Sequence, residues 1–403
     1  MEKEKKICMV LDSDYPDDIR IKKEVKTLTK YGYYIFILCL RFNKKQLKKE
    51  YNNKITISRF YLPRKIALIS RGLINTFFDY YTFFWVLKIC GVIKKNNIKI
   101  IHLHDLYLFK AGIYTKKICN KRDIKLVGDL HENYIEAIKE YIHSRRFLSN
   151  FIMNFKRWSK KEVKWIRQFD SVISVIEEAQ SRLEKKGIEK EKIYLVPNYA
   201  DMNELNKLSI NHNLYGYYKK YYNILYLGGI NRHRGLTILI DAVKLLKNKI
   251  NNLKCIIVGG GSFIDDIKKY VKDLNLYSVV DILGGVPFND IRNFIEISNI
   301  CIIPHLKNSH TDTTIPHKLF QYMYFKKPVI VSDCIPLRRI VSDSQCGLVY
   351  ESYNHNELSN NVIKLFNDSM LERDLGINGR KAVIEKYNWK ISEDELTKLY
   401  RNL

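Results

Sequence analysis

The sequence predicts an α/β protein with two Rossmann-like, doubly wound parallel-sheet domains. Two observations carry this prediction. Short apolar runs typical of buried strands alternate with helical segments along the chain, which is the pattern of parallel sheets. The alternation stops after Pro197 and restarts at Asn223, and 403 residues are too many for one ordinary core. We therefore expect domains at residues 1–200 and 201–380, and a C-terminal helix at 381–403 that crosses back to the first domain.

Six buried strands are predicted in the first domain. Each is a short run rich in Val, Ile and Leu that is bounded by polar or turn-forming residues. A helix is expected from Ile19 to Tyr31, and Gly32 follows it where a helix commonly ends in a left-handed residue. The six predicted strands are Lys6–Leu11, Tyr34–Leu40, Ile98–Leu103, Lys125–Leu130, Val172–Val175 and Lys192–Val196.

Residues 203–222 are predicted to form a linker, because they are rich in Asn, Tyr and Lys and show no period. The second domain repeats the alternation, and residues 372–403 are expected to be helical. Since ligands of open α/β sheets bind at the carboxyl ends of the strands, we expect the two domains to face one another across a ligand-binding cleft. The predicted strands of the second domain are Asn223–Leu227, Lys254–Val258, Val279–Leu283, Ile300–Pro304 and Pro328–Ser332.

The composition excludes a disordered chain, since 46% of the residues are hydrophobic and apolar runs recur along the length. The formal net charge of +26 indicates an anionic partner, which is nucleic acid, an anionic lipid surface or a phosphorylated ligand. The surface composition of a Lys- and Asn-rich proteome would explain the same charge. Eight cysteines without a Cys-x-x-Cys pair are expected to be reduced core residues. The start MEKEKKICMVLD shows no secretory signal, so we expect a cytoplasmic protein.

Two basic segments with interleaved aromatic residues lie in the first domain, at Arg64–Lys95 and His143–Arg167. Asp79 and Lys88 interrupt the first segment, which argues against a membrane-spanning helix. Two interpretations remain open. The segments either lie on an anionic membrane surface, which would place the protein peripherally on the inner face of the cell membrane, or pack on the sheet with a solvated basic side.

The segment TDTTIPHKLFQYMYFKKPVIVSD is the most informative in the chain. It predicts a loop, a helix with Pro316 in its first turn, and a buried strand. Lys318 lies in that first turn too, where its charge opposes the helix dipole unless an anion binds there. Because helix N-termini attract phosphate groups, we expect Lys318 to hold a diphosphate, and Gln321 on the same face to hold a ribose. The alternative is a surface lysine beside an ordinary polar residue.

At these residues the sequence resembles the group 1 glycosyltransferases, also called family 4, which have the GT-B fold of two Rossmann-like domains. The resemblance covers nearly the whole chain and is strongest from Tyr222 to Tyr350. Members carry a Pro-x-Lys-x-x-Glu-Tyr-Met helix and then a Gly-x-Pro-Val strand, and IPHKLFQYMYFKKPVIVSD is similar at most positions. Two glutamates that flank the donor in the family are replaced here by Thr313 and Gln321. An amide binds a ribose less tightly than a carboxylate does, so we interpret the chain as a divergent, active branch.

The resemblance also implies donor-binding residues in the glycine-rich turns of the second domain. In NILYLGGINRHRGLTILIDAV, Arg234-Gly235 is similar to a Lys-Gly pair of the family, and the arginine fork suits phosphate oxygens. Arg232 is expected to substitute for a family arginine whose position holds Gly229. Glycines permit close approach of the backbone to a ligand. The other positions assigned to the donor are Gly228, Gly259, Gly261, Thr314, Ile315 and Pro316.

Two predicted strands of the first domain end in a histidine and an acid. They are IIHLHDLYLF, with His104 and Asp105, and KLVGDLHENYIEA, with His131 and Glu132. Strand ends are where ligands meet in such folds, so we place these residues on the acceptor side. Members of the resembled family often have a His at the second of these turns, which implies that His131 orients the transferred sugar. A structural role for any single histidine is the alternative.

Arg20 follows the opening loop DSDYPDDIR, which resembles the family's opening loop. It is expected to reach an acceptor or a phosphate, or else to cap the local acids Asp17 and Asp18. PNYAD, from Pro197 to Asp201, resembles a structural hinge of the family.

The resemblance implies a retaining hexosyltransferase, and the two basic amphipathic segments indicate a role in cell-surface polysaccharide synthesis. Its substrates are a nucleotide diphosphate sugar and a saccharide or lipid-linked acceptor. No cofactor or metal is expected to be obligatory, because Arg234 and Lys318 would neutralise the leaving diphosphate. One rival is a basic nucleic-acid-binding protein, although no nucleic-acid module is recognised and no specific nucleic acid is expected. The other is a catalytically inactive GT-B fold that acts as a membrane-associated partner.

Overall fold

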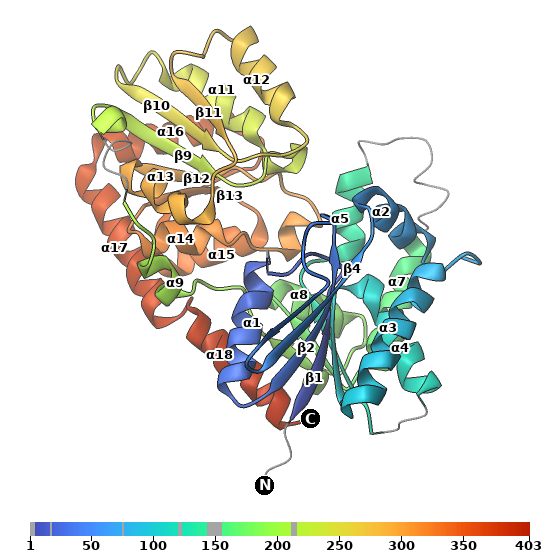
Figure 1. The fold of residues 1–403 in the computed structure, drawn as a ribbon. Coiled ribbons are helices and arrows are strands. Elements are labelled where there is room, and N and C mark those ends of the chain that lie inside the picture. Colours follow the sequence, from blue (N-terminus) through green and yellow to red (C-terminus); the bar gives the residue numbers. More distant parts are fainter. Residues whose placement is uncertain (1–4, 17, 75, 120–122, 143–154, 211–215) are drawn as a thin grey trace. The chain divides into compact units, whose positions relative to one another are not determined.

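The structure, a computed structural model, describes residues 5–16, 18–74, 76–119, 123–142, 155–210 and 216–403, and the chain divides into two compact units (Figure 1). Unit 1 comprises the residues up to Asn198 together with Ser392–Leu403. Unit 2 comprises Tyr199–Ile391. The last helix, α18 (Trp389–Arg401), therefore contributes most of its length to unit 1.

Unit 1 is built on an eight-stranded sheet in the order β3-β4-β2-β1-β5-β6-β7-β8. β3 and β4 pair antiparallel, and the other neighbours pair parallel. The strands are β1 (Lys6–Val10), β2 (Tyr34–Arg41), β3 (Lys49–Asn52), β4 (Ile55–Tyr61), β5 (Ile100–His104), β6 (Lys125–Leu130), β7 (Ser171–Ser174) and β8 (Ile193–Leu195).

Side chains alternate between the two faces of this sheet, and the sequence assigns a different role to each face. Ile101, Leu103 and Leu126 belong to the core under the helices α2 (Arg64–Leu73), α3 (Tyr80–Asn96), α4 (Leu106–Ile118) and α7 (Phe155–Ile166). His102 and Asp129 occupy alternate positions and contact residues of α1 (Ile19–Lys30) and α18 on the other face. Burial of one Ile or Leu contributes about 1.5–3 kcal/mol, so a one-residue shift of register is strongly disfavoured. The remaining helices of unit 1 are α5 (Tyr134–Ile142) and α8 (Glu177–Lys185).

Unit 2 has a parallel six-stranded sheet in the order β11-β10-β9-β12-β13-β14. Its strands are β9 (Tyr222–Leu227), β10 (Leu253–Val258), β11 (Val280–Gly284), β12 (Ile300–Ile303), β13 (Val329–Ser332) and β14 (Gly347–Tyr350). One core includes residues of α11 (Leu236–Leu246), α12 (Ile264–Asp273) and α16 (His355–Asn367). The core on the opposite face includes residues of α9 (Met202–Asn206), α13 (Ile291–Ile297), α14 (Lys318–Tyr324), α15 (Ile335–Ser344) and α17 (Ser369–Glu385). Helices on both faces of a parallel sheet make each unit doubly wound, as the sequence predicts.

The predicted linker at residues 203–222 is largely wrong. α9 overlaps its start, and Leu205, Leu208 and Tyr218 are buried in the core of unit 2. These apolar residues are too widely spaced among Asn and Lys to give a period, so the pattern concealed their burial. Residues 211–215 of the segment lie outside the described part of the chain.

The chain end is mainly helical over residues 372–403, as the sequence predicts, and it consists of two helices. α17 stops at Glu385, and the turn before α18 places the Trp389 amide 2.8 Å from the Ala200 carbonyl. β3, β4 and β14 are further strands that the sequence pattern did not reveal. The side chains of β3 are all exposed, so it carries no apolar signal.

Within the described ranges, no helix combines the length and the hydropathy that a membrane span requires.

Candidate functional site

Lys318 is the first residue of α14, and its ammonium is buried. The residue is 6% exposed, Nζ lies 3.6 Å from the centroid of the Tyr226 ring, and no described residue accepts a hydrogen bond from it. Burial of an unpaired ammonium costs several kcal/mol, whereas a desolvated cation–π contact contributes only about 2 kcal/mol. Burial, together with the charge of Arg234, lowers the pKa of Lys318 well below its ordinary value. This arrangement favours an anionic ligand.

Arg234 ends the short 3-10 helix η2 (Arg232–Arg234), and its guanidinium lies 2.8 Å from Nε2 of His305. His233, His305 and His310 are all buried. Burial, reinforced by the charge of Arg234, lowers the pKa of His233 to about 3 and that of His310 to about 4, and holds the pKa of His305 well below its ordinary value. Lys318 adds to the effect on His305, which indicates that Arg234 and Lys318 act on one place. Two cations are thus gathered among neutral imidazoles.

Glycines in the turns near Lys318 and Arg234 allow backbone segments to lie closer together than a side chain would permit. A Cβ on Gly228 would lie 3.3 Å from Nζ of Lys318, so a side chain there would crowd the ammonium. Gly259 has φ +148°, and a Cβ would stand 1.8 Å from the Gly228 carbonyl oxygen. A Cβ on Gly261 would stand 2.1 Å from the carbonyl oxygen of Ile230. Gly229 has no such close contact, since its nearest neighbour would lie at 3.5 Å.

The loop before α14 holds Thr313, one of the two positions at which the chain departs from the family pattern; the other, Gln321, lies on α14 itself. Thr313 and Thr314 donate their hydroxyls to the carbonyls of Ser309, at 2.9 Å, and His310, at 3.1 Å. Ile315 and Pro316 follow and are half-buried. The helix begins two residues after Pro316, so this proline precedes the first turn in which the sequence placed it.

Gln321 and Arg232 differ in their relation to the cluster. Gln321 lies on α14 one turn from Lys318 and is half-buried, and its amide makes no hydrogen bond to a described residue, which leaves it available to a ligand. Arg232 is exposed and lies over the Phe263 ring at 5.2 Å. Its expected substitution for the family arginine therefore has no support from its contacts.

Arg20 is buried in unit 1, and its guanidinium is fully engaged in an internal network of hydrogen bonds and ion pairs. Its guanidinium donates to both carboxylate oxygens of Asp129 at 3.1–3.2 Å and to the Val196 carbonyl at 2.8 Å, and it pairs with Glu24 at 3.0 Å. The prediction that Arg20 contacts an acceptor or phosphate is wrong, because these partners occupy the guanidinium. The alternative is that the Arg20 side chain caps the local acids. Instead, the side chain of Asp18 accepts the backbone N–H of Arg20 and caps the N-terminus of α1. Asp17 lies outside the described residues.

His131 follows β6, and Asp129 holds it in the charged form. Nε2 of His131 lies 3.3 Å from the carboxylate of Asp129 and 3.0 Å from Nδ1 of His104. Burial by itself would lower the pKa of His131, but the carboxylates of Asp129 and Asp105 outweigh burial and raise it to about 10. His104 is buried more deeply, and burial holds its pKa well below the ordinary value. His104 Nδ1 therefore accepts the proton of His131 Nε2, which fixes the orientation of the charged ring.

Asp105 and Glu132 lie beside these histidines at the strand ends. Asp105 has φ +71°, and its carboxylate accepts the hydroxyl of Tyr107 at 2.9 Å. Glu132 is half-buried. The structure thus brings His104, Asp105 and His131 together. Arg20 belongs to the internal network instead, where it binds the carboxylate of Asp129.

The donor atoms of Glu24, His102, His104 and Asp129 lie within 4.8 Å of one another, a grouping that a metal ion could use. Arg20 already neutralises both carboxylates of this group, and His104 is bonded to His131. A dication would be a third cation beside Arg20 and His131, so these residues do not fit one.

The sequence interpretation missed Asp129, His102, Glu24 and Tyr400. Tyr400 of α18 is hydrogen-bonded to Nδ1 of His102 at 2.8 Å, which ties the chain end to the network. A signal existed for two of these residues, since a carboxylate or histidine inside a strand such as KLVGDL or IIHLH must find a partner when it is buried.

Two protein families match the chain, one over each half. "Glycosyltransferase Family 4" matches residues 21–204, and "Glycosyl transferases group 1" matches residues 210–382. An uncharacterized glycosyltransferase of Methanocaldococcus jannaschii is 26% identical over 78% of both chains. The poly(ribitol-phosphate) alpha-N-acetylglucosaminyltransferase of Staphylococcus aureus is 22% identical over 86% of this chain and 67% of its own. The capsular polysaccharide biosynthesis glycosyltransferase CapM of Staphylococcus aureus is 22% identical over 57% of this chain and 60% of its own.

Solved structures share the fold at low sequence identity. Sucrose-phosphate synthase from Thermosynechococcus elongatus gives a TM-score of 0.77 at 16% identity, over 99% of both chains. HepE from Anabaena, in complex with UDP and glucose, gives a TM-score of 0.73 at 14% identity, over 99% of this chain and 100% of its own. The chain belongs to the group 1, or family 4, glycosyltransferases and has their GT-B fold of two Rossmann-like domains.

Proposed function

We propose that this glycosyltransferase moves a hexose from a nucleotide diphosphate sugar to a saccharide or lipid-linked acceptor, with retention of anomeric configuration, in cell-surface polysaccharide synthesis. The observation that carries the donor assignment is the buried ammonium of Lys318 beside the guanidinium of Arg234. The charged neighbours that shift the pKa of Lys318 include no carboxylate. A diphosphate matches this site in charge, whereas a neutral sugar or a nucleoside does not.

The remaining residues receive roles that follow from their chemistry. Charge develops on the diphosphate as the glycosidic bond breaks, and fixed cations stabilise that charge in place of a metal ion. The free amide of Gln321 would bind a ribose hydroxyl. His131, charged and oriented by Asp129 and His104, would donate a hydrogen bond to the transferred sugar. Retention follows from the family resemblance, with the acceptor hydroxyl attacking from the face that the diphosphate leaves.

The relatives support the choice of pathway and of donor class. Two of them carry names that refer to polysaccharide or to poly(ribitol phosphate), and HepE was solved with UDP and glucose. UDP is therefore the first nucleotide to test here.

The proposal is tested by thermal unfolding with a panel of nucleoside diphosphates. The nucleotide of the true donor should raise the unfolding midpoint, with about 2.7 kcal/mol of stabilisation at a hundredfold excess over its dissociation constant. Lys318→Met keeps most of the side-chain volume and removes the charge. We expect it to lose the nucleotide response, while the empty variant is at least as stable as the wild type because an unpaired buried charge is gone.

The matched control is Lys268→Met, which removes an exposed lysine of unit 2 and should respond like the wild type. The diphosphate site is refuted if no nucleoside diphosphate shifts the wild type, or if Lys318→Met responds as strongly as Lys268→Met.

A further inference from the structure

Unit 1 exposes a dense group of large apolar side chains on α2, on the turn after it and on the first half of α3. Phe77 is 97% exposed, Leu87 73% and Phe78 71%. Surface apolar residues are ordinary when scattered, but a contiguous group marks a binding surface. We define the α2–α3 surface by its exposed apolar residues, Ile66, Leu68, Ile69, Phe77, Phe78, Tyr80, Phe83 and Leu87.

These apolar residues are exposed although the helices that carry them are well packed against unit 1. The opposite side of α3 is fully used, since Trp85, Ile89 and Ile93 are buried in the core of unit 1. Ser70 of α2 and Tyr80 of α3 join the two helices by a hydroxyl hydrogen bond of 2.6 Å. The exposed side is therefore held in one arrangement by a well-packed opposite side.

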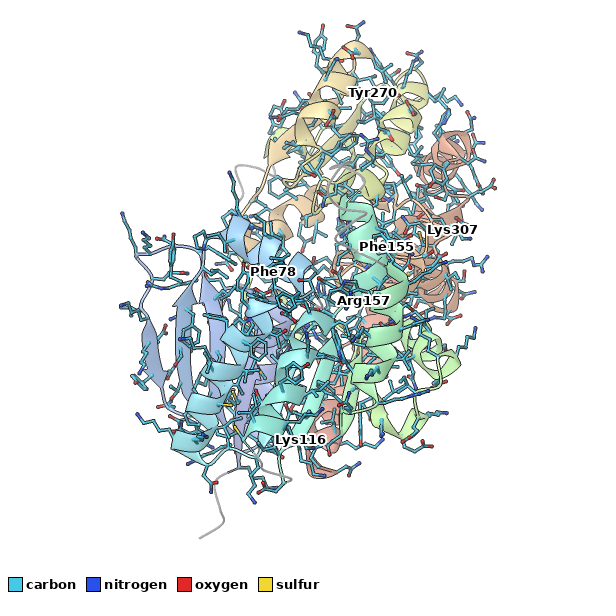
Figure 2. The ribbon with its side chains drawn as sticks, turned by 90° about the vertical axis from the view of Figure 1, so that its right-hand side faces the viewer. Phe78, Lys116, Phe155, Arg157, Tyr270 and Lys307 are labelled. Atoms are coloured by element: carbon cyan, nitrogen blue, oxygen red, sulfur yellow. The ribbon has the colours of Figure 1, made fainter. Side chains whose placement is uncertain are left out.

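The charge around this surface has one sign. α2, α3, α4 and α7 together contain one acidic residue, Glu162, which is buried against Arg182 and Lys186. Figure 2 shows this side of unit 1, with Phe78 beside α3 and with Lys116 and Arg157 on α4 and α7. The cations crowd one another, since burial and the charges of Lys164 and Arg157 lower the pKa of Lys161. Exposed bases on these helices are Arg64, Lys65, Lys94, Lys95, Lys117, Lys156, Arg157, Lys160 and Lys164.

The α2–α3 surface adjoins the strand ends that carry the acceptor-side residues. Arg71 of α2 forms an ion pair with the buried Asp12 after β1 and lies over the Tyr107 ring at 4.7 Å. Tyr107 in turn donates to Asp105, the residue that follows β5. Two contacts thus lead from α2 to the turn that holds His104 and Asp105.

We propose that the α2–α3 surface docks this enzyme on an anionic lipid bilayer, with its apolar side chains in the headgroup region, and that the bilayer presents a lipid-borne acceptor to the adjoining strand ends. The claim of bilayer docking rests on the exposed apolar side chains and the positive charge around them. The claim that the bilayer presents the acceptor rests on the proposed function. Burial of aliphatic side chains such as Ile69 and Leu87 in lipid is favourable, but these side chains do not stack on nucleic-acid bases. The composition of the surface therefore favours a bilayer over nucleic acid as the partner. The absence of exposed acids on the four helices favours anionic headgroups.

The test measures co-sedimentation of the full chain with vesicles of phosphatidylcholine, with and without phosphatidylglycerol. We expect binding to require phosphatidylglycerol and to weaken with salt. Phe77→Ser/Phe78→Ser should weaken binding about tenfold or more, because it removes two exposed rings that lipid would bury. Arg64→Glu/Lys65→Glu should weaken it as well. The matched controls lie in unit 2, where Tyr277→Ser removes an exposed aromatic ring and Lys268→Glu/Lys269→Glu reverses two exposed charges, and both should bind like the wild type.

Unchanged vesicle binding by Phe77→Ser/Phe78→Ser, or no binding by the wild type, would overturn the proposal. So would loss of a dimer, seen by sedimentation velocity, or loss of binding to generic duplex DNA, as the main effect of that variant. The nucleoside diphosphate response is measured on the same proteins, and it should be unaffected by these substitutions. A failed docking surface is thereby distinguished from a failed donor site.

Discussion

Lys318 and His131 are the two residues whose ionisation the surrounding structure changes most clearly in the candidate sites. Burial and Arg234 lower the pKa of Lys318, and the carboxylates of Asp129 and Asp105 raise the pKa of His131 to about 10 against the opposing effect of burial. The protonated form of Lys318 has no counter-charge among the described residues and is disfavoured, whereas the protonated form of His131 is stabilised by the carboxylate of Asp129. Their difference fits an anion as the partner of Lys318 and a neutral hydroxyl as the partner of His131.

Nucleoside diphosphate binding should take up protons. In the free protein burial lowers the pKa values of Lys318, His233, His305 and His310, and a bound diphosphate would raise them again. The complex then holds more protons than the free protein, so affinity should rise as the pH falls through the interval between the free and bound pKa values. Titration calorimetry in two buffers of different ionisation enthalpy measures this uptake. At about pH 8 the phosphates of the nucleotide, with a second pKa near 6, are already ionised and contribute little.

Binding heats that do not depend on the buffer would contradict this prediction. Lys318→Met, if it retains any binding, should take up fewer protons than the wild type.

At the scale of elements, the sequence was most predictive where burial and period agreed. The strands β1, β2, β6, β9 and β10 are largely buried and mainly apolar, and the sequence predicts their positions within about two residues. β3 was invisible because its side chains are exposed, and the segment around α9 was assigned to a linker because Leu205 and Leu208 stand among polar residues. Of the site, Lys318 and Arg234 could be found from the motif, but Asp129 could not be linked to Arg20, because that contact joins residues 109 positions apart.

Two adjacent glycines in the turn after β10 should differ strongly in how substitution by alanine affects stability. Gly259 has φ +148° and no room for a Cβ, whereas Gly260 has no atom within 4 Å of an added Cβ. Gly259→Ala should therefore destabilise the protein by about 2 kcal/mol or more, while Gly260→Ala should stay within about 0.5 kcal/mol of the wild type. Urea unfolding of the two variants measures the difference. Equal stabilities would show that the turn at Gly259 is not closed as described.

At the scale of the whole molecule, the two units carry different parts of the chemistry. Unit 2 gathers the cations suited to a diphosphate, and unit 1 places oriented histidines beside a surface suited to lipid. Thr313 and Gln321 stand where the family has two glutamates, and we expect the amide of Gln321 to hold a ribose less tightly than a carboxylate would. Thr313 and Gln321 change neither the buried ammonium nor the guanidinium, so we expect turnover to survive.

The most direct test of the central claim is steady-state hydrolysis of the nucleotide sugar whose nucleotide the binding panel identifies, in which water takes the sugar and nucleoside diphosphate is released. The wild type should release it, Lys318→Met should lose both release and nucleotide binding, and His131→Gln should bind the nucleotide normally but release it at least about a hundredfold more slowly. Release by Lys318→Met at the wild-type rate would contradict the account. Tight nucleotide binding by a wild type that releases nothing would contradict it as well, since the chain would then be an inactive member of its family.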